Sequence, residues 1–146
     1  MKILHNYLAL VGALILLLMG TGCGRHAKEA SLPPNESAGK SSPQLVDVTE
    51  AKRMIAARQV TILDVRTPDE FSAGHIAGAK NLNFNDGDFQ AKLQQLDKGQ
   101  PYLVQCRTGH RSAQAGAVMK KLGFKSVYDL AGGITAWEQA KQEVVK

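Results

Sequence analysis

The sequence has few of the residues that mark several protein classes. It contains two cysteines, Cys23 and Cys106, far apart in a chain of 146 residues, which excludes a disulfide-stapled mini-protein and most structural zinc sites. Aromatic residues make up only 5% of the chain, and the net charge of +5 is scattered rather than gathered in a run. Nucleic acid is therefore not an expected partner. The length suits one ordinary domain rather than two enzyme domains.

The N-terminal segment has no apolar run long enough to cross a membrane. Its run extends from Leu8 to Met19, whereas a spanning helix needs about 20 apolar residues. One positive charge, Lys2, precedes the run, and small residues follow it. This pattern predicts a secretory signal peptide over residues 1–22, with an uncleaved membrane anchor as the alternative interpretation.

Cys23 directly follows Gly-Thr-Gly, which resembles the lipobox of bacterial lipoproteins, with Gly20 where an aliphatic residue is usual. The resemblance implies cleavage before Cys23 and lipidation of its sulfur. Several acyl chains on one residue anchor durably, since each buried methylene contributes about 0.8 kcal/mol. We therefore expect an extracytoplasmic protein, on the periplasmic side, that is lipid-anchored to a bacterial membrane.

Residues 23–43 form a segment of different composition. It holds three of the five prolines and several serines, and it has no apolar periodicity. Such a segment cannot bury enough surface to offset the entropy of ordering it. We interpret it as a flexible tether, which leaves residues 44–146 as the folded domain.

From Gln44 onward, β-rich runs alternate with helical patterns. We expect strands over residues 45–46, 60–64, 79–84, 102–105 and 126–130. Helical spacing occurs over residues 50–57, 88–96 and 111–122, in a short helix after Thr67-Pro68-Asp69-Glu70, and after Gly133. Thr67, Pro68 and Glu70 match an N-cap, a proline at the first helical position and a capping-box glutamate. This alternation predicts an α/β sandwich in which helices flank a mostly parallel central sheet.

The most informative stretch runs from Cys106 to Ser112, with the sequence Cys-Arg-Thr-Gly-His-Arg-Ser. Cys106 ends a buried strand and a helix follows, and α/β sheets bind ligands at this end of their strands. A loop over a helix N-terminus directs backbone N–H groups at a common centre and favours an anion there. Gly109 supplies the backbone freedom for such a turn.

The same surroundings favour the thiolate form of Cys106. The helix N-terminus, Arg107 and Arg111 should lower the pKa of its thiol. A thiolate is a nucleophile whose natural use is a covalent sulfur intermediate. The alternative is an inert buried cysteine, but two arginines and a histidine are poor neighbours for an apolar burial site.

Three motifs in order resemble those of a single-domain rhodanese, a sulfurtransferase, over about residues 44–144. The first comprises Asp64-Val65-Arg66, Glu70-Phe71 and residues 74–81, the second is the loop from Cys106 to Ser112, and the third is Leu130-Ala131-Gly132-Gly133-Ile134 with Trp137. The resemblance implies the rhodanese-like three-layer sandwich. It also implies that Cys106 takes the outer sulfur of thiosulfate, releases sulfite and holds a persulfide, which cyanide or a thiol acceptor then attacks. We expect a monomer that uses no cofactor.

Substrate contacts are expected from the loop residues Arg107, Thr108, Gly109, His110 and Arg111. Both arginines can hydrogen-bond the oxygens of an anionic sulfur donor in fork geometry, and the backbone N–H groups would stabilise the persulfide. For His110 an exposed loop position is an equal alternative. Cys106 and His110 lack the further ligands of a zinc site, so no metal is expected.

Three further charged residues, Asp64, Arg66 and Glu70, should lie near the mouth of the sheet. They either orient the loop arginines or form structural ion pairs, and structural pairs are the favoured interpretation because such networks are common.

Two other functions are compatible with this fold. Related phosphatases have a longer loop, Cys-x5-Arg, whereas Arg111 lies at Cys-x4-Arg. The smaller cradle favours a sulfur atom over a phosphoryl group, so phosphatase or arsenate reductase activity is the less favoured enzyme. A non-catalytic rhodanese-type binding module is the other alternative. Such modules often lose the cysteine or the basic loop, and this chain has both.

Overall fold

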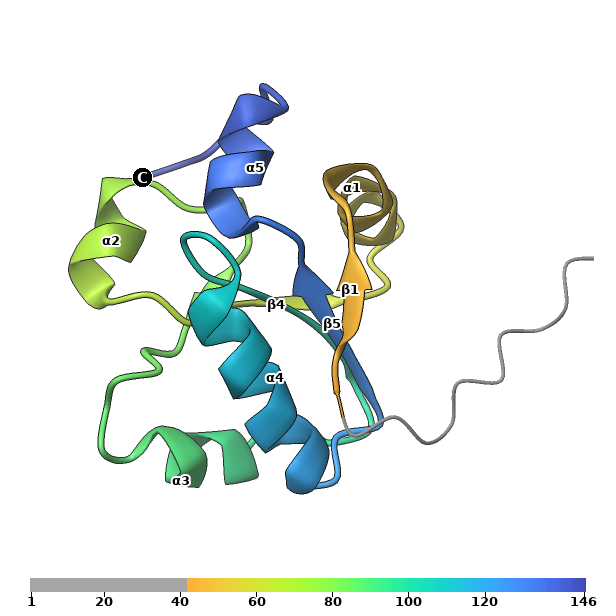
Figure 1. Cartoon of the computed structure of the whole chain (residues 1–146), viewed down its shortest axis with the longest axis vertical. Helices are drawn as coiled ribbons and strands as arrows, with labels where there is room; N and C mark the ends of the chain where they lie inside the picture. Colours follow the sequence, from red (N-terminus) through yellow and green to blue (C-terminus); the bar gives the residue numbers. More distant parts are fainter. Residues whose placement is uncertain (1–41) are drawn as a thin grey trace, which may run out of the picture. The chain divides into compact units, whose positions relative to one another are not determined.

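Five strands form a fully parallel central sheet in the computed structural model, which describes residues 42–146 (Figure 1). The strands are β1 (Gln44–Val46), β2 (Thr61–Asp64), β3 (Lys80–Asn81), β4 (Pro101–Gln105) and β5 (Ser126–Leu130). Their order across the sheet is β1-β5-β4-β2-β3, so β4 is central. The predicted signal peptide, Cys23 and the predicted tether as far as residue 41 lie outside the described residues.

Helices cover both faces of this sheet. They are α1 (Val48–Ala56), α2 (Pro68–Ala73), α3 (Phe89–Gln94), α4 (His110–Lys121) and α5 (Gly133–Gln139). Side chains of α3 and α4 pack in one apolar cluster with the sheet, and side chains of α1 and α5 pack in the other. The predicted three-layer sandwich is therefore confirmed. No helix within residues 42–146 has the length and apolar character needed to cross a membrane.

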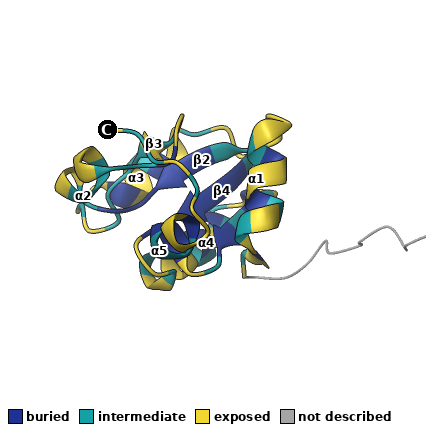
Figure 2. Ribbon diagram, turned by 90° about the horizontal axis from the view of Figure 1, so that it is seen from above, coloured by how far each residue is buried: buried dark blue, intermediate teal, exposed yellow. Residues whose placement is uncertain are grey.

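The residues of the central strand β4 from Tyr102 to Gln105 are buried, and Figure 2 draws this strand in dark blue. Tyr102 and Val104 belong to the cluster under α3 and α4, whereas Leu103 belongs to the cluster under α1 and α5. Successive side chains of a strand point to opposite faces. Cys106 continues the series of Tyr102 and Val104 and so lies on the α4 face of the sheet.

The predicted strand over residues 79–84 is wrong in extent, because only Lys80 and Asn81 pair with β2. Its partner β2 ends at Asp64, where the chain turns toward α2. The next N–H groups, of Leu82 and Phe84, donate to the carbonyl oxygens of Asp64 and Val65 without extending the ladder. The length of the edge strand is thus set by the end of its neighbour.

A capping box begins α2, as the sequence predicts. The Thr67 hydroxyl accepts a hydrogen bond from the Glu70 N–H, and the Glu70 carboxylate accepts one from the Thr67 N–H. These bonds satisfy two backbone donors at the helix start. They also hold Glu70 at the edge of the sheet where the strands end.

We predict that Leu103→Ala lowers the free energy of unfolding by about 2–5 kcal/mol, because it opens a cavity in the central strand. Leu103 is completely buried, whereas Leu45 on β1 is 68% exposed. The matched change Leu45→Ala should therefore alter stability by less than about 0.5 kcal/mol. Urea unfolding of both variants measures the difference, and equal losses would contradict the assigned core.

Candidate active site

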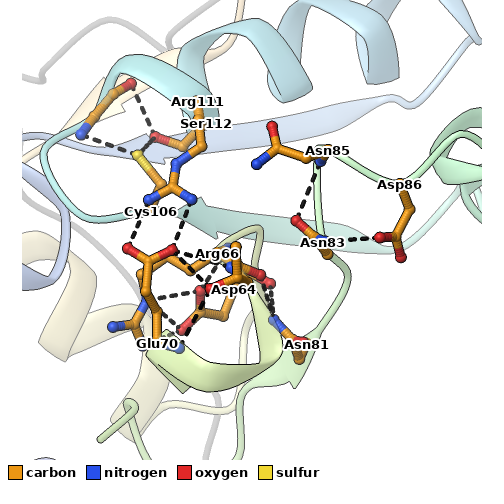
Figure 3. Close-up of polar contacts among 12 residues, drawn as sticks. Asp64, Arg66, Glu70, Asn81, Asn83, Asn85, Asp86, Cys106, Arg111 and Ser112 are labelled. Carbon is orange, nitrogen blue, oxygen red and sulfur yellow. Dashed lines mark hydrogen bonds and ion pairs between the residues drawn. The ribbon is translucent and has the colours of Figure 1, made fainter. Parts of the chain in front are cut away.

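Cys106 lies directly after β4, at the carboxyl end of the central strand (Figure 3). The short stretch from Arg107 to Gly109 connects it to α4. Cys106 is only 1% exposed, and its sulfur lies beneath this loop. Open α/β sheets place ligands at this edge, which is where the sequence analysis placed the reactive thiol.

The loop closes around the sulfur through Gly109. This residue has φ 103°, in the region that favours glycine. In this conformation its N–H donates to Cys106 Sγ, with 3.2 Å between nitrogen and sulfur. The twelve-residue helix α4 begins at the next residue, so the positive end of its dipole is close to the sulfur.

Ser112 is a site residue for which the sequence analysis assigned no role. It is fully buried in the first turn of α4, and its Oγ lies 3.5 Å from Cys106 Sγ and 3.0 Å from the Gly109 carbonyl oxygen. Its signal in the sequence was its place in the first turn of the helix that follows the loop. That signal could not reveal that the hydroxyl points inward to the sulfur.

The pKa of the Cys106 thiol lies below its ordinary value. Burial raises this pKa, but hydrogen bonds outweigh it, first from the Ser112 hydroxyl and then from the N–H groups of Ser112, Gly109 and Thr108. The sequence analysis assigned the effect to the helix N-terminus and the arginines. These N–H groups lie at or beside the N-terminus of α4, and the Ser112 hydroxyl is the contribution that the sequence analysis did not include. Arg107 is exposed.

Arg111 is held in place by Glu70 through two parallel hydrogen bonds. Nη1 donates to Oε2 and Nη2 donates to Oε1, each at 2.8 Å, and Figure 3 shows the guanidinium directed from α4 toward Glu70. The bond with Arg111 lowers the pKa of Glu70 to about 2, in spite of partial burial. Glu70 therefore orients a loop arginine, which was the less favoured of the two predicted roles.

Asp64 and Arg66 form the structural ion pair that the sequence analysis favoured for them. Both are buried, and Arg66 Nε lies 2.9 and 3.0 Å from the two carboxylate oxygens. Arg66 Nη2 also donates to the carbonyl oxygen of Gly74, at the end of α2. The pair thus ties the end of β2 to the end of α2.

The outer rim of the loop is formed by Arg107, Thr108 and His110, all of which are exposed. The His110 ring nitrogens lie 3.2 and 3.3 Å from Gln114 Nε2, one turn along α4. The side chains predicted to meet a substrate therefore divide into an exposed rim and the inner, partly buried Arg111. Their contacts with a substrate stay predictions.

Helix α5 supports the loop from the opposite side. The N–H groups of Ile134 and Thr135 donate to the carbonyl oxygens of Cys106 and Arg107, at 2.8 and 3.1 Å. Gly133 has φ 58°, and a side chain there would collide with the backbone of Cys106 and Arg107. Glycine at position 133, in the third motif, is therefore required so that the start of α5 can approach the loop backbone.

A sequence profile of the rhodanese-like domain matches residues 47–140, and this match spans both β4 and the loop. The chain belongs to the rhodanese-like domain family. The thiosulfate sulfurtransferase GlpE of Pseudoalteromonas translucida is 32% identical over 102 residues, which cover 69% of this chain and 94% of that protein. GlpE of Shewanella oneidensis is 39% identical over 97 residues, which cover 66% of this chain and 88% of that protein.

A solved structure shows the same fold. The crystal structure of a rhodanese-related protein from Thermoplasma volcanium has a TM-score of 0.63 and 31% sequence identity, and the match covers 70% of this chain and 97% of that one. The rhodanese-like domain match and the two GlpE proteins support sulfurtransferase activity in general.

We predict that Glu70→Gln reduces stability most at neutral pH. The pKa of Glu70 is lowered from 4.5 to about 2, so its proton binds less readily to the folded state than to the unfolded chain. The contribution of the pair is complete above pH 4.5 and is lost as the pH falls toward 2. Glutamine can still complete the capping box.

The measurement is urea unfolding of wild type and variant across this pH range. The difference in unfolding free energy should be on the order of 1 kcal/mol at neutral pH, because solvent screens a partly exposed pair, and should vanish in acid. Glu50→Gln is the matched control, since it breaks the exposed pair with Arg53. A difference independent of pH would refute the role given to Glu70.

Proposed function

We propose that the protein moves a sulfane sulfur from thiosulfate, or from a persulfide donor, to cyanide or a thiol through a persulfide on Cys106. The observation that carries the proposal is the surroundings of the sulfur. Hydrogen bonds from Ser112 and the loop N–H groups lower the pKa of the thiol, which favours the reactive thiolate form. The curated relatives named thiosulfate sulfurtransferases support the same chemistry.

Each half of the proposed reaction conserves the number of electrons. The Cys106 thiolate attacks the outer sulfur of thiosulfate, and a new sulfur–sulfur bond forms in the Cys106 persulfide. The sulfur–sulfur bond of thiosulfate breaks at the same time, and sulfite leaves with the electron pair of that bond. The acceptor then attacks the terminal sulfur of the persulfide, and Cys106 leaves again as the thiolate. Backbone N–H groups that already face the sulfur would stabilise the negative charge of both states.

The charges around the loop favour a small anionic donor. Arg107 is exposed and can attract such a donor, whereas Arg111 is engaged by Glu70. A dianion that reaches the sulfur would compete with the Glu70 carboxylate for the same fork of N–H donors. Since Cys106 itself is 1% exposed, side chains of the rim or this ion pair must move to admit the donor.

We predict that incubation of the full chain with thiosulfate adds one sulfur atom to Cys106, detected by mass spectrometry of its peptide, and that cyanide then releases thiocyanate. Cys106→Ser should abolish both signals, because it removes the nucleophile. The matched cysteine variant, Cys23→Ser, should retain them.

Two other results would reject this function. A wild-type protein that takes no sulfur from any sulfane donor but binds a specific protein would be a binding module. Release of phosphate from aryl phosphates, abolished by Cys106→Ser, would instead assign phosphatase chemistry to the loop.

We also propose that the protein is lipid-anchored through Cys23 on the extracytoplasmic side of a bacterial membrane. The Gly-Thr-Gly-Cys sequence after an apolar run supports this location. Cys23→Ser should release the protein from membranes or block its processing, as measured by fractionation and intact mass. An unchanged mass and distribution would contradict lipidation.

A further inference from the structure

Basic residues that are scattered along the sequence gather at one end of the domain. Parallel strands begin at the same edge of a sheet, and here Thr61 of β2 pairs with Tyr102 of β4. Pro101 of β4 pairs with Ser126 of β5, so the three strands begin side by side. The segments that lead into them are residues 57–60, 95–100 and 118–125, the last of which includes the end of α4. These segments carry five cations, which we call the basic end: Arg58, Lys98, Lys120, Lys121 and Lys125.

Two hydrogen bonds join the segments of the basic end. The Lys125 N–H donates to the Lys98 carbonyl oxygen at 3.0 Å, and Lys120 Nζ donates to the Lys125 carbonyl oxygen at 3.2 Å. Figure 1 shows the end of α4 and the start of β5 together at the lower end of the view. Lys120 is half-buried, whereas the other four members are exposed. The basic end therefore presents its charges to solvent.

The positive charge of the described domain is concentrated at this end. Its segments contain one acidic residue, Asp97, whose Oδ1 accepts the Gly99 N–H. Elsewhere in residues 42–146, nine basic residues stand beside ten acidic ones. None of the ion pairs among residues 42–146 includes a member of the basic end. The surface is thus suited to a partner that carries negative charge.

The chain enters the described domain beside the basic end. Pro43, just before β1, lies so close to Gly116 that a side chain at position 116 would collide with the proline ring. Gly116 precedes Lys120 by about one turn of α4. The residues before Pro43 include Cys23 and the apolar run of residues 8–19. Membrane attachment through either of these would connect the bilayer to the domain next to its basic end.

An anionic lipid surface fits these observations better than a nucleic acid does. Headgroup phosphates attract lysines and arginines that lie near a bilayer, and this attraction needs no fixed one-to-one partners. The 20 residues from 24 to 43 can span at most about 70 Å, so a domain attached through Cys23 stays close to the bilayer. The segments of the basic end contain one aromatic residue, Phe124, and it is buried. They therefore offer no aromatic surface on which bases could stack.

We propose that the basic end is a docking surface for anionic phospholipid headgroups, which holds the domain on the membrane with the Cys106 loop directed away from it. Cys106 follows the carboxyl end of β4, whereas the basic end lies at the amino ends of the strands. Docking would therefore leave the loop open to soluble donors and acceptors. The inference rests on the proposed membrane location and is independent of the proposed chemistry.

The test is a lysine footprint of the full chain, reconstituted into vesicles by detergent removal. Vesicles that contain phosphatidylglycerol are compared with vesicles of phosphatidylcholine alone, and acetylation of each lysine is measured by mass spectrometry of its peptide. The anionic vesicles should slow acetylation of Lys98, Lys121 and Lys125 by about fivefold, the effect of one lysine–headgroup attraction. Lys80 and Lys141, which are exposed outside the basic end, should react equally on both. Salt at about 0.5 M should remove the protection by screening.

Two variants of equal net charge locate the effect. Lys121→Gln with Lys125→Gln removes two charges from the basic end, and Lys98 should then be acetylated at nearly the same rate on both kinds of vesicle. Lys80→Gln with Lys141→Gln removes two charges from elsewhere and should retain the protection of Lys98 of about fivefold. All four replaced side chains are exposed, so both variants should keep the fold and stability of wild type.

Three results would overturn the proposal. The first is the same footprint on both kinds of vesicle, and the second is an equal loss of protection in the two double variants, which would trace the effect to net charge. The third is stronger protection of Lys98 by RNA than by anionic vesicles at equal phosphate concentration, which would assign the surface to nucleic acid.

Failure of the membrane location is read separately, by co-sedimentation with phosphatidylcholine vesicles. A chain that binds only the anionic vesicles lacks the anchor, and its footprint is then compared with that of the chain in solution. Protection of the basic end in that comparison would support the docking surface without the anchor. A chain that sediments with neither kind of vesicle would overturn both proposals.

Discussion

The site depends on one electrostatic constraint, the arrangement of hydrogen-bond donors around a buried sulfur at the N-terminus of α4. Burial of Cys106 by itself raises the pKa of its thiol, and only the donors of the loop and Ser112 reverse this effect. The constraint is local, because all of these donors belong to Ser112 and to a loop that is shorter than one helical turn. It follows that small displacements of the loop would change the chemistry of the sulfur more than they change the fold.

The remainder of the domain holds this loop in its position. On one side β4, buried in the centre of the sheet, positions Cys106, and on the other the first N–H groups of α5 bind the loop carbonyl groups. The capping box of α2 holds Glu70, which in turn holds Arg111. The contacts of α5 with the loop and of Glu70 with Arg111 join segments that are distant in the sequence, so the parallel sheet is what brings them together.

Much of the fold could be predicted from the sequence, because strand and helix periodicity are local properties. The strand over Ser126–Leu130 has the predicted bounds, and the helix beginning after the loop differs by one residue at each end. The strand over residues 79–84 could not be predicted correctly, since its length depends on where β2 ends. Asp47, which caps α1 through its side chain, likewise had no periodic signal.

The sequence alone identified Cys106 as the candidate reactive residue, because Cys106 and its glycine and arginines are neighbours in the chain and their chemistry is local. It also determined the family, through three motifs in order. Only the tertiary structure decided which donors act on the sulfur and which carboxylate binds Arg111, since Glu70 and Arg111 are 41 residues apart. Packing in the folded protein decides which distant partner a side chain points toward, and this direction cannot be predicted from the residues that are its neighbours in the sequence.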